Sequence, residues 1–318
     1  MINHKPIHVG VVGCGWIMRS IYTPTLLSMP DLVNVSAVCD LNEEAAHASA
    51  AQFPNAAVFN DVRAMLQETK LDAVMVLTSE KVNAIMARLV LKANLHVYLE
   101  KPPAISSEEL EDLIAIEAQS KSFVYAAFNR RHTPLFTGLD FAEGKITRVS
   151  GALKRLKRAV ATFPHTSIHL IDSAQHFAGS FLESWNINFE RKPGNAVWTI
   201  DGKLENGAAV ALEFVPDGAE FAEYLVIETD GGKWELQFPN TVAEVPEGEL
   251  IVTPTDGSPS TITRGRKTLP SIEAMGFRLC LLAFIEEVNK PKASSPHRLP
   301  SCRATIRVIE EMEACVKA

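Results

Sequence analysis

The sequence predicts an α/β protein of two domains: a doubly wound parallel sheet in residues 1–125, then an α+β domain with a large, mostly antiparallel sheet in residues 126–318. Three observations lead to this expectation. The chain has 318 residues, about twice the roughly 150 residues of one domain. Before residue 129, short apolar runs alternate with segments of helical period. After it, longer runs of period two predominate.

In the first domain, apolar runs alternate with helical segments, as in the βαβ units of a parallel sheet. Strands are expected at residues 7–12, 33–39, 73–77, 96–99 and 123–128, with a short one near residue 58. Helices are expected at residues 43–52, 62–69, 81–92 and 108–120. Residues 106–109, Ser-Ser-Glu-Glu, supply an N-terminal capping box for the last of them.

In the second domain, the alternating pattern is typical of half-buried antiparallel strands. These strands are expected at residues 184–190, 196–202, 208–214, 224–229 and 233–238. Gly231 and Gly232 predict a hairpin turn between the last two. Two closing helices are expected at residues 272–288 and 303–316, and an exposed loop at residues 256–266.

Composition and charge narrow the classes of function. Lys and Arg number 31 against 38 Asp and Glu, a net charge of -7, which opposes binding to nucleic acid. No stretch approaches the ~18 apolar residues of a membrane helix, and the start lacks the pattern of a signal peptide. The five cysteines are widely spaced, without Cys-x-x-Cys, which indicates reduced thiols. We expect a cytoplasmic protein that binds neither nucleic acid nor membrane.

The strand at residues 7–12 leads into a Gly-x-Gly turn and a helical segment. Gly13 permits the tight turn, and Gly15 lets the backbone approach a pyrophosphate, although Met18 replaces the third glycine of the pattern. Asp40 closes the second strand, where a carboxylate would bind the adenosine ribose and repel a 2′-phosphate. This pattern predicts a Rossmann fold that binds NAD in preference to NADP. The alternative is that the glycines only make a turn and Asp40 only caps a helix.

The second motif is Glu-Lys-Pro-Pro at residues 100–103, directly after the strand at residues 96–99. Ligands of such sheets bind at the carboxyl ends of the strands. Lys101 in this position can hydrogen-bond a substrate hydroxyl and stabilise an alkoxide. The alternative is an exposed loop lysine without a role in chemistry.

The third feature is a stripe of His165, His169, Asp172 and His176, spaced by four, three and four residues. At ~100° per residue the four lie within roughly 60° of one helix face, and the other face is apolar. The alternatives are histidines with structural roles and a zinc site. The Glu of a His-Glu-x-x-His pattern is missing, so we expect no metal.

Taken in order along nearly the whole chain, these motifs resemble the Gfo/Idh/MocA family of dehydrogenases, which act chiefly on sugars and polyols. The Gly-x-Gly turn with Asp40 is similar to the family's nucleotide site, and residues 100–102 to its Glu-Lys-Pro. Residues 128–134 are similar to its link into the substrate domain, and residues 169–172 to the end of its Asp-x-Gly-x-His-x-x-Asp helix.

The resemblance implies roles for individual residues. Lys101 would be the catalytic or orienting lysine, and His169 the acid/base. The implied cofactor contacts are Gly13, Gly15, Trp16, Ile17, Asp40, Thr78, Glu100 and Lys101. The implied substrate contacts are Asp172, which would bind hydroxyls, and Asn129, Arg131, His165 and His176. Trp16 could line the nicotinamide pocket or pack in the core.

Two departures from the family pattern bear on the reaction. The first acid of the helix motif is His165 here, and its glycine is Ser167. The family's Thr-Pro-x-x-x-His is replaced at residues 78–83 by Thr-Ser-Glu-Lys-Val-Asn. The division of labour between lysine, aspartate and histidine that is usual in the family cannot be carried over unchanged.

The leading hypothesis is hydride transfer between NAD and a carbinol or carbonyl carbon of a sugar, polyol or related compound. Two alternatives are a redox-neutral oxidation and elimination with recycled NAD, and an NAD-binding sensor without turnover. Residues 154–158 are basic and are expected on a strand, with Arg155 and Lys157 on one face. If that face lines the cleft, an acidic or phosphorylated ligand is favoured. The antiparallel sheet resembles the surface through which family members associate, so a homodimer or homotetramer is expected.

Overall fold

The computed structural model describes residues 5–139, 144–192, 195–240, 246–292 and 295–317. The chain forms two compact units, Met1–Phe128 with Phe277–Arg303, and Asn129–Gly276 with Ala304–Ala318. The first boundary lies close to the one expected after residue 125. The return of residues 277–303 to the first unit was not expected from the sequence, which predicted two contiguous domains.

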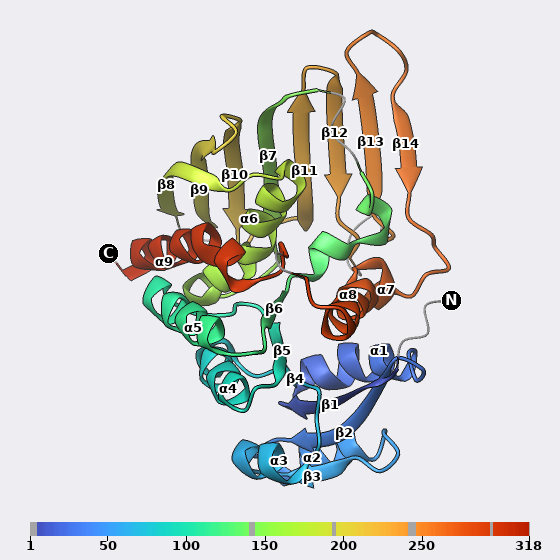
Figure 1. Cartoon of the computed structure of the whole chain (residues 1–318). Helices are drawn as coiled ribbons and strands as arrows, with labels where there is room; N and C mark the ends of the chain where they lie inside the picture. The colour runs from blue at the N-terminus through green and yellow to red at the C-terminus, as the bar shows by residue number, and fades with distance from the viewer. Residues whose placement is uncertain (1–4, 140–143, 193–194, 241–245, 293–294, 318) are drawn as a thin grey trace. The chain divides into compact units, whose positions relative to one another are not determined.

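The first unit is built on a six-stranded parallel sheet in the order β3-β2-β1-β4-β5-β6 (Figure 1). Its strands are β1 (Ile7–Val12), β2 (Val33–Cys39), β3 (Ala57–Phe59), β4 (Ala73–Val76), β5 (His96–Glu100) and β6 (Val124–Ala127). β4 and β6 are buried along their whole length, as expected of a sheet covered on both faces. The strand order reverses between β1 and β4, which is the ligand-binding point of a doubly wound sheet.

The helices that cover this sheet are α1 (Thr23–Leu27), α2 (Glu43–Ala50), α3 (Val62–Glu68), α4 (Glu80–Lys92), α5 (Ser107–Gln119) and, from the distant segment, α8 (Phe277–Asn289). Three of them, α2, α3 and α5, have side-chain caps at their N-termini, from Asn42, Asp61 and Ser106. The predicted capping box on α5 is confirmed: Ser106 Oγ accepts from the Glu109 N–H at 3.2 Å, and Glu109 Oε2 accepts from the Ile105 N–H at 3.0 Å.

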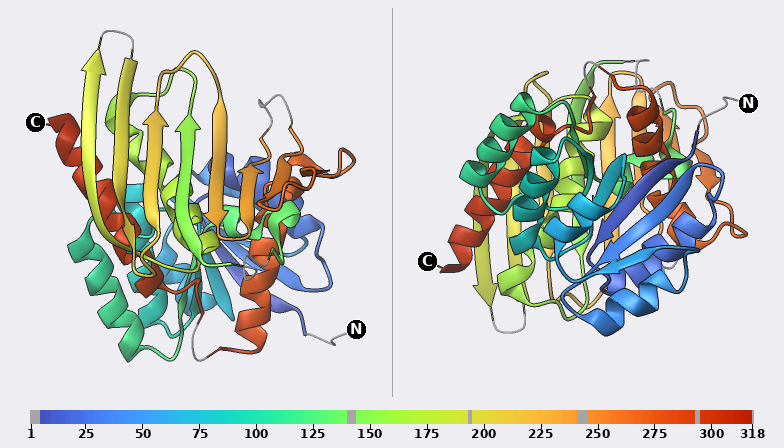
Figure 2. Two further views of the ribbon diagram at one scale, coloured as in Figure 1. Left: turned by 90° about the horizontal axis from the view of Figure 1, so that it is seen from above. Right: turned by 60° about the horizontal axis from the view of Figure 1, so that its bottom comes forward.

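The second unit contains an eight-stranded sheet in the order β14-β13-β12-β11-β7-β10-β9-β8 (Figure 2). Its strands are β7 (Ile146–Lys154), β8 (Leu182–Lys192), β9 (Asn195–Leu204), β10 (Ala209–Val215), β11 (Ala222–Thr229), β12 (Gly232–Gln237), β13 (Glu249–Pro254) and β14 (Thr261–Arg264). Every pairing is antiparallel except that of β7 with β10. The predicted fold class, a Rossmann-type sheet followed by an α+β domain, is confirmed.

Two helices of the second unit, α6 (Pro164–Ala178) and α9 (Arg303–Lys317), bury their apolar faces. α6 packs on β7, β10 and β11, which places it over the middle of the sheet. Its expected apolar residues are all buried: Ile168, Leu170, Ile171, Ala174 and Phe177. The predicted turn between β11 and β12 is present, formed by Asp230 and Gly231, and Gly232 already belongs to β12.

Two sequence-based expectations about elements are wrong. The helix expected over residues 272–288 is split into α7 (Ser271–Ala274) and α8 by Gly276, which has a φ of +88°. A Cβ at Gly276 would lie 2.3 Å from the Asn129 carbonyl oxygen, so this position requires glycine, and its positive φ separates α7 from α8. The loop expected at residues 256–266 contains β14, an edge strand whose exposed residues show no alternation.

Candidate functional site

The glycine turn after β1 has the two properties that a phosphate-binding turn needs. Gly13 has a φ of +98°, and a Cβ there would lie 2.6 Å from the Leu77 carbonyl oxygen, so glycine is required. A Cβ at Gly15 would meet nothing within 4 Å, so the backbone there is open to a ligand. Trp16 beside it is 66% exposed, which places its indole outside the core. Ile17 follows at the start of the helical segment.

Met18, which replaces the third glycine, is fully buried, and the chain forms a π-helical turn over Met18–Tyr22. Asp40 lies at the end of β2, where the motif places it. Its Oδ2 accepts a hydrogen bond from the Cys14 N–H at 2.6 Å, and its Oδ1 accepts one from the Asn42 N–H at 2.9 Å. The carboxylate therefore has a fixed position beside the glycine turn.

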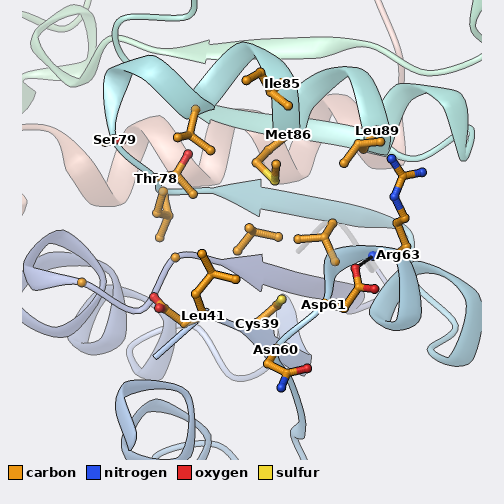
Figure 3. Close-up of a pocket in the computed structure, with 17 residues that line it drawn as sticks. Cys39, Leu41, Asn60, Asp61, Arg63, Thr78, Ser79, Ile85, Met86 and Leu89 are labelled. Atoms are coloured by element: carbon orange, nitrogen blue, oxygen red, sulfur yellow. Dashed lines mark hydrogen bonds between the residues drawn. The ribbon is translucent and has the colours of Figure 1, made fainter. Parts of the chain in front are cut away.

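A pocket of about 660 Å³ opens at this edge of the sheet, within the size range of ligand sites. Its walls come from the ends of β1, β2 and β4, from the loop before α3 and the first residues of α3, and from α4 (Figure 3). The lining residues are Val12, Gly13, Gly15, Cys39, Asp40, Leu41, Asn60, Asp61, Val62, Arg63, Leu77, Thr78, Ser79, Val82, Ile85, Met86 and Leu89. The structure thus brings together the predicted contacts Gly13, Gly15, Asp40 and Thr78. An apolar wall for a base, an open glycine and a fixed acid fit a dinucleotide.

Lys101 follows β5 and is half-buried, with a cis peptide bond to Pro102. The side chain of Glu100 folds back onto this turn, because its Oε2 accepts from the Lys101 N–H at 3.0 Å. Its Oε1 accepts from the Tyr22 hydroxyl at 2.5 Å. Glu100 is 7% exposed, so its carboxylate holds the turn from within the first unit.

The predicted histidine stripe lies on α6, which belongs to the second unit. Pro164 begins the helix and Gly179 ends it with a φ of +59°. His165, His169 and His176 are half-buried, and Asp172 is fully buried. The helix that the spacing predicts is confirmed.

Asp172 and Arg131 form a buried ion pair. Arg131 donates from Nε to Oδ2 at 2.9 Å and from Nη2 to Oδ1 at 2.5 Å, and the two side chains are 4% and 1% exposed. Burial raises the pKa of the Asp172 carboxyl, and the Arg131 guanidinium opposes that rise. Asn129, another predicted substrate contact, is buried and donates from Nδ2 to the Met275 carbonyl at 2.8 Å. The side chains of Asp172, Arg131 and Asn129 therefore all form hydrogen bonds within the second unit.

His165 and His176, the first and last histidines of the stripe, have neighbours that the sequence did not indicate. His165 Nε2 lies 2.6 Å from Glu313 Oε1, a carboxylate on α9 with no motif around it. Burial, together with the nearby Arg131 and His132, lowers the pKa of His176 to about 3. His176 is therefore neutral in this environment.

The expectation that Arg155 and Lys157 share a face of a strand is wrong. β7 ends at Lys154, and Lys157 has a φ of +54° in the turn that follows. The Arg155 guanidinium is buried and donates to the Glu223 carboxylate at 2.5 Å; Arg130 donates to the same carboxylate at 2.8 and 3.0 Å. Although burial raises the pKa of Glu223, these two arginines hold it at about 2. Arg155 thus serves a buried ion-pair cluster.

Within the described ranges, no three or more His, Cys, Asp and Glu side chains are grouped so that they could hold a metal ion. In the same residues, no helix is long and apolar enough to cross a membrane.

Comparison with known proteins agrees with the geometry of the first unit. Residues 7–128 match the family described as "Oxidoreductase family, NAD-binding Rossmann fold" (GFO_IDH_MocA). The match covers the sheet of the first unit, and over these residues the resemblance to the Gfo/Idh/MocA family identified in the sequence is confirmed.

Two curated relatives are dehydrogenases. D-glucoside 3-dehydrogenase of Escherichia coli (strain K12) is 32% identical over 112 residues, which are 35% of this chain and 32% of that protein. Inositol 2-dehydrogenase 2 of Saccharopolyspora erythraea is 26% identical over 261 residues, 76% of each chain. The alignment thus spans about a third of the first relative and three quarters of the second.

Solved structures extend the likeness to the whole fold. A dehydrogenase from Chromobacterium violaceum has a TM-score of 0.85 at 21% identity and covers 98% of this chain and 95% of its own. UDP-N-acetylglucosamine 3-dehydrogenase from Acidithiobacillus ferrooxidans has a TM-score of 0.80 at 16% identity, with 98% of each chain covered. At these identities the likeness shows the fold alone.

Proposed function

We propose that this protein is an NAD-dependent oxidoreductase that transfers a hydride between nicotinamide and a carbinol or carbonyl carbon of a sugar, polyol or sugar derivative. The observation that carries the proposal is the edge of the first sheet. The open Gly15, the fixed Asp40 and the Lys101 turn all lie at the carboxyl ends of its strands. The names of the two dehydrogenase relatives support the substrate class.

The preference for NAD rests on Asp40. A carboxylate held at the end of the second strand accepts hydrogen bonds from the ribose hydroxyls and repels a 2′-phosphate. Arg63 lines the same pocket, and a solved structural relative, the 3-ketoreductase KijD10, was crystallised with NADP. Affinities for NADH and NADPH should therefore be measured side by side, and we expect NADH to bind more tightly.

Bound nicotinamide supplies the hydride chemistry, and this chain's residues handle the proton and the orientation of the substrate. We assign removal of the hydroxyl proton to His169, which is half-buried on α6. Lys101 stabilises the developing alkoxide with its ammonium group. Asp172 holds α6 in place through Arg131, and His165 Nε2, 2.6 Å from Glu313 Oε1, ties the same helix face to α9.

The open face of the second unit's sheet supports association into a homodimer or homotetramer. On β11, Tyr224 is 37% exposed, while its neighbours Glu223 and Leu225 on the opposite face are buried. Ile262 on β14 is 58% exposed and lies on the same open face, in line with Val226 of β11. Contiguous apolar patches on a sheet face are typical of protein interfaces, and we place the proposed interface on this face.

The experiment is to follow nicotinamide absorbance while the protein is mixed with NAD and a panel of inositols, glucosides and sugar acids. We expect reduction of NAD with at least one compound. The Lys101→Ala variant should lower kcat on that compound by at least about 10²-fold. NADH binding without reduction on any panel member would favour a redox-neutral enzyme or a sensor. Unchanged kcat in Lys101→Ala would remove the role assigned to Lys101.

A further inference from the structure

Asn83, near the start of α4, holds the main chain on both sides of Lys101. Its side chain is fully buried. The amide Nδ2 donates one hydrogen bond to the Glu100 carbonyl oxygen at 3.0 Å and a second to the Pro102 carbonyl oxygen at 3.1 Å. One side chain therefore donates to both of the carbonyls that flank the lysine.

The same side chain contacts the wall of the nucleotide pocket. Asn83 Oδ1 accepts a hydrogen bond from the Thr78 hydroxyl at 2.8 Å. Thr78 lines the pocket and lies, with Ser79, where β4 ends and α4 begins (Figure 3). A continuous path of three hydrogen bonds thus leads from the pocket through Asn83 to the turn that carries Lys101.

We propose that Asn83 is a positioning residue that fixes the Lys101 turn and couples it to occupancy of the nucleotide pocket through Thr78. The proposal rests on the function proposed for Lys101. It follows from the sensitivity of catalysis to geometry, since a displacement of about 1 Å at a catalytic group can cost about 10²-fold in rate. Removing the amide takes one donor from each of these two carbonyls, so the turn loses two of the contacts that restrain it.

The first test measures the turn directly by hydrogen–deuterium exchange of the peptide that covers residues 98–104, with and without NADH. In the parent protein, we expect NADH to slow exchange in this peptide. In Asn83→Ala, exchange without NADH should rise at least about tenfold, and NADH should no longer slow it. The matched control is Ser120→Ala, because the Ser120 hydroxyl donates to the Leu91 carbonyl at 3.2 Å at the far end of the same helix. It should leave the peptide unchanged.

The second test is a double-mutant cycle with Lys101→Ala on the substrate that the panel identifies. Asn83→Ala alone should lower kcat at least about tenfold, with KM and the Kd for NADH within about threefold. In the Lys101→Ala background, Asn83→Ala should have no further effect on kcat. A merely structural residue would lower kcat by the same factor in both backgrounds, and that result would overturn the inference.

The two proposals fail in different ways. Unchanged kcat in Lys101→Ala counts against the proposed function, whereas a full effect of Lys101→Ala with none from Asn83→Ala counts against Asn83 alone. If Asn83→Ala proves poorly folded by circular dichroism, Thr78→Val removes only the hydroxyl that contacts Asn83. That variant should abolish the effect of NADH on exchange of the peptide, and persistence of the effect would contradict the coupling.

Discussion

The buried pair of Arg131 and Asp172 allows a quantitative test of how the second unit holds α6. Arg131→Met leaves the Asp172 carboxylate without its partner at a site where it is 1% exposed. Removing one partner of a buried pair costs about 3–5 kcal/mol, because the remaining charge is uncompensated. At about 2–4 °C per kcal/mol for a unit of this size, Tm should fall by about 6–20 °C. Asp172→Leu, which removes the other partner of the pair, should lower the stability by a similar amount.

The assay is thermal unfolding followed by circular dichroism, on the two single variants and on the double variant Arg131→Met with Asp172→Leu. The double variant should recover most of the loss, since apolar groups of similar volume replace a buried pair at little cost. Arg303→Met is the matched control: it breaks the pair with Glu111, whose members are 49% and 52% exposed, and should cost at most about 1 kcal/mol. If Arg131→Met costs no more than this control, the pair does not hold α6 and the reasoning is refuted.

Three further outcomes are expected. Gly13→Ala should lower Tm because a Cβ would meet backbone at 2.6 Å, whereas Gly15→Val should leave Tm unchanged and abolish NADH binding in a fluorescence titration. His176 has a pKa of about 3 in the folded protein, below its ordinary 6.5. As the pH falls, the imidazole of the unfolded chain is therefore protonated at a higher pH than that of the folded chain, which favours unfolding. Stability should be full above pH 6.5 and fall as the pH drops toward 3. His176→Gln should reduce this fall without removing it, because the folded pKa values of His96 and His132 are also lowered, to about 4. Charges on the open sheet face, as in Tyr224→Lys with Ile262→Lys, should convert an oligomer to monomers in light scattering without lowering Tm.

Elements whose signal is local were predicted closely. The bounds of β1 and β2 agree with the structure because each is an apolar run bounded by turn residues, and both are interior strands of a covered sheet. α6 was predicted as one helix because its apolar residues recur at helical period, but the burial of Asp172 on its polar face was not predicted. In β1, β2 and the apolar face of α6, the pattern of burial is contained in the segment itself.

The errors arise where distant parts of the chain decide the local structure. The break before α8 lies at Gly276, where the Asn129 backbone, far away in the sequence, leaves no room for a side chain. Arg155 was expected on a strand, but its pairing with Glu223 depends on the neighbouring β11. β14 is an exposed edge strand, so it has no buried face to impose alternation on its sequence.

The residues of the candidate site also fall into two groups, those recognised from a local motif and those that only the fold brings together. The glycine turn and the Glu-Lys-Pro turn were recognisable because each is a short contiguous motif. The partners that orient its residues were not, because they come from other elements: Arg131 for Asp172, Glu313 for His165, and Asn83 for Lys101. The replacement at Asn83 was visible as a departure from the family pattern, but its contacts with the carbonyls required the fold.

The most direct test of the central claim is a titration of the purified protein with NADH and, separately, NADPH, followed by nicotinamide fluorescence. The account predicts saturable binding of NADH, weaker binding of NADPH, and a gain in NADPH affinity in Asp40→Ser, because that variant lacks the carboxylate that repels a 2′-phosphate. No binding of either nucleotide by the folded protein would contradict it.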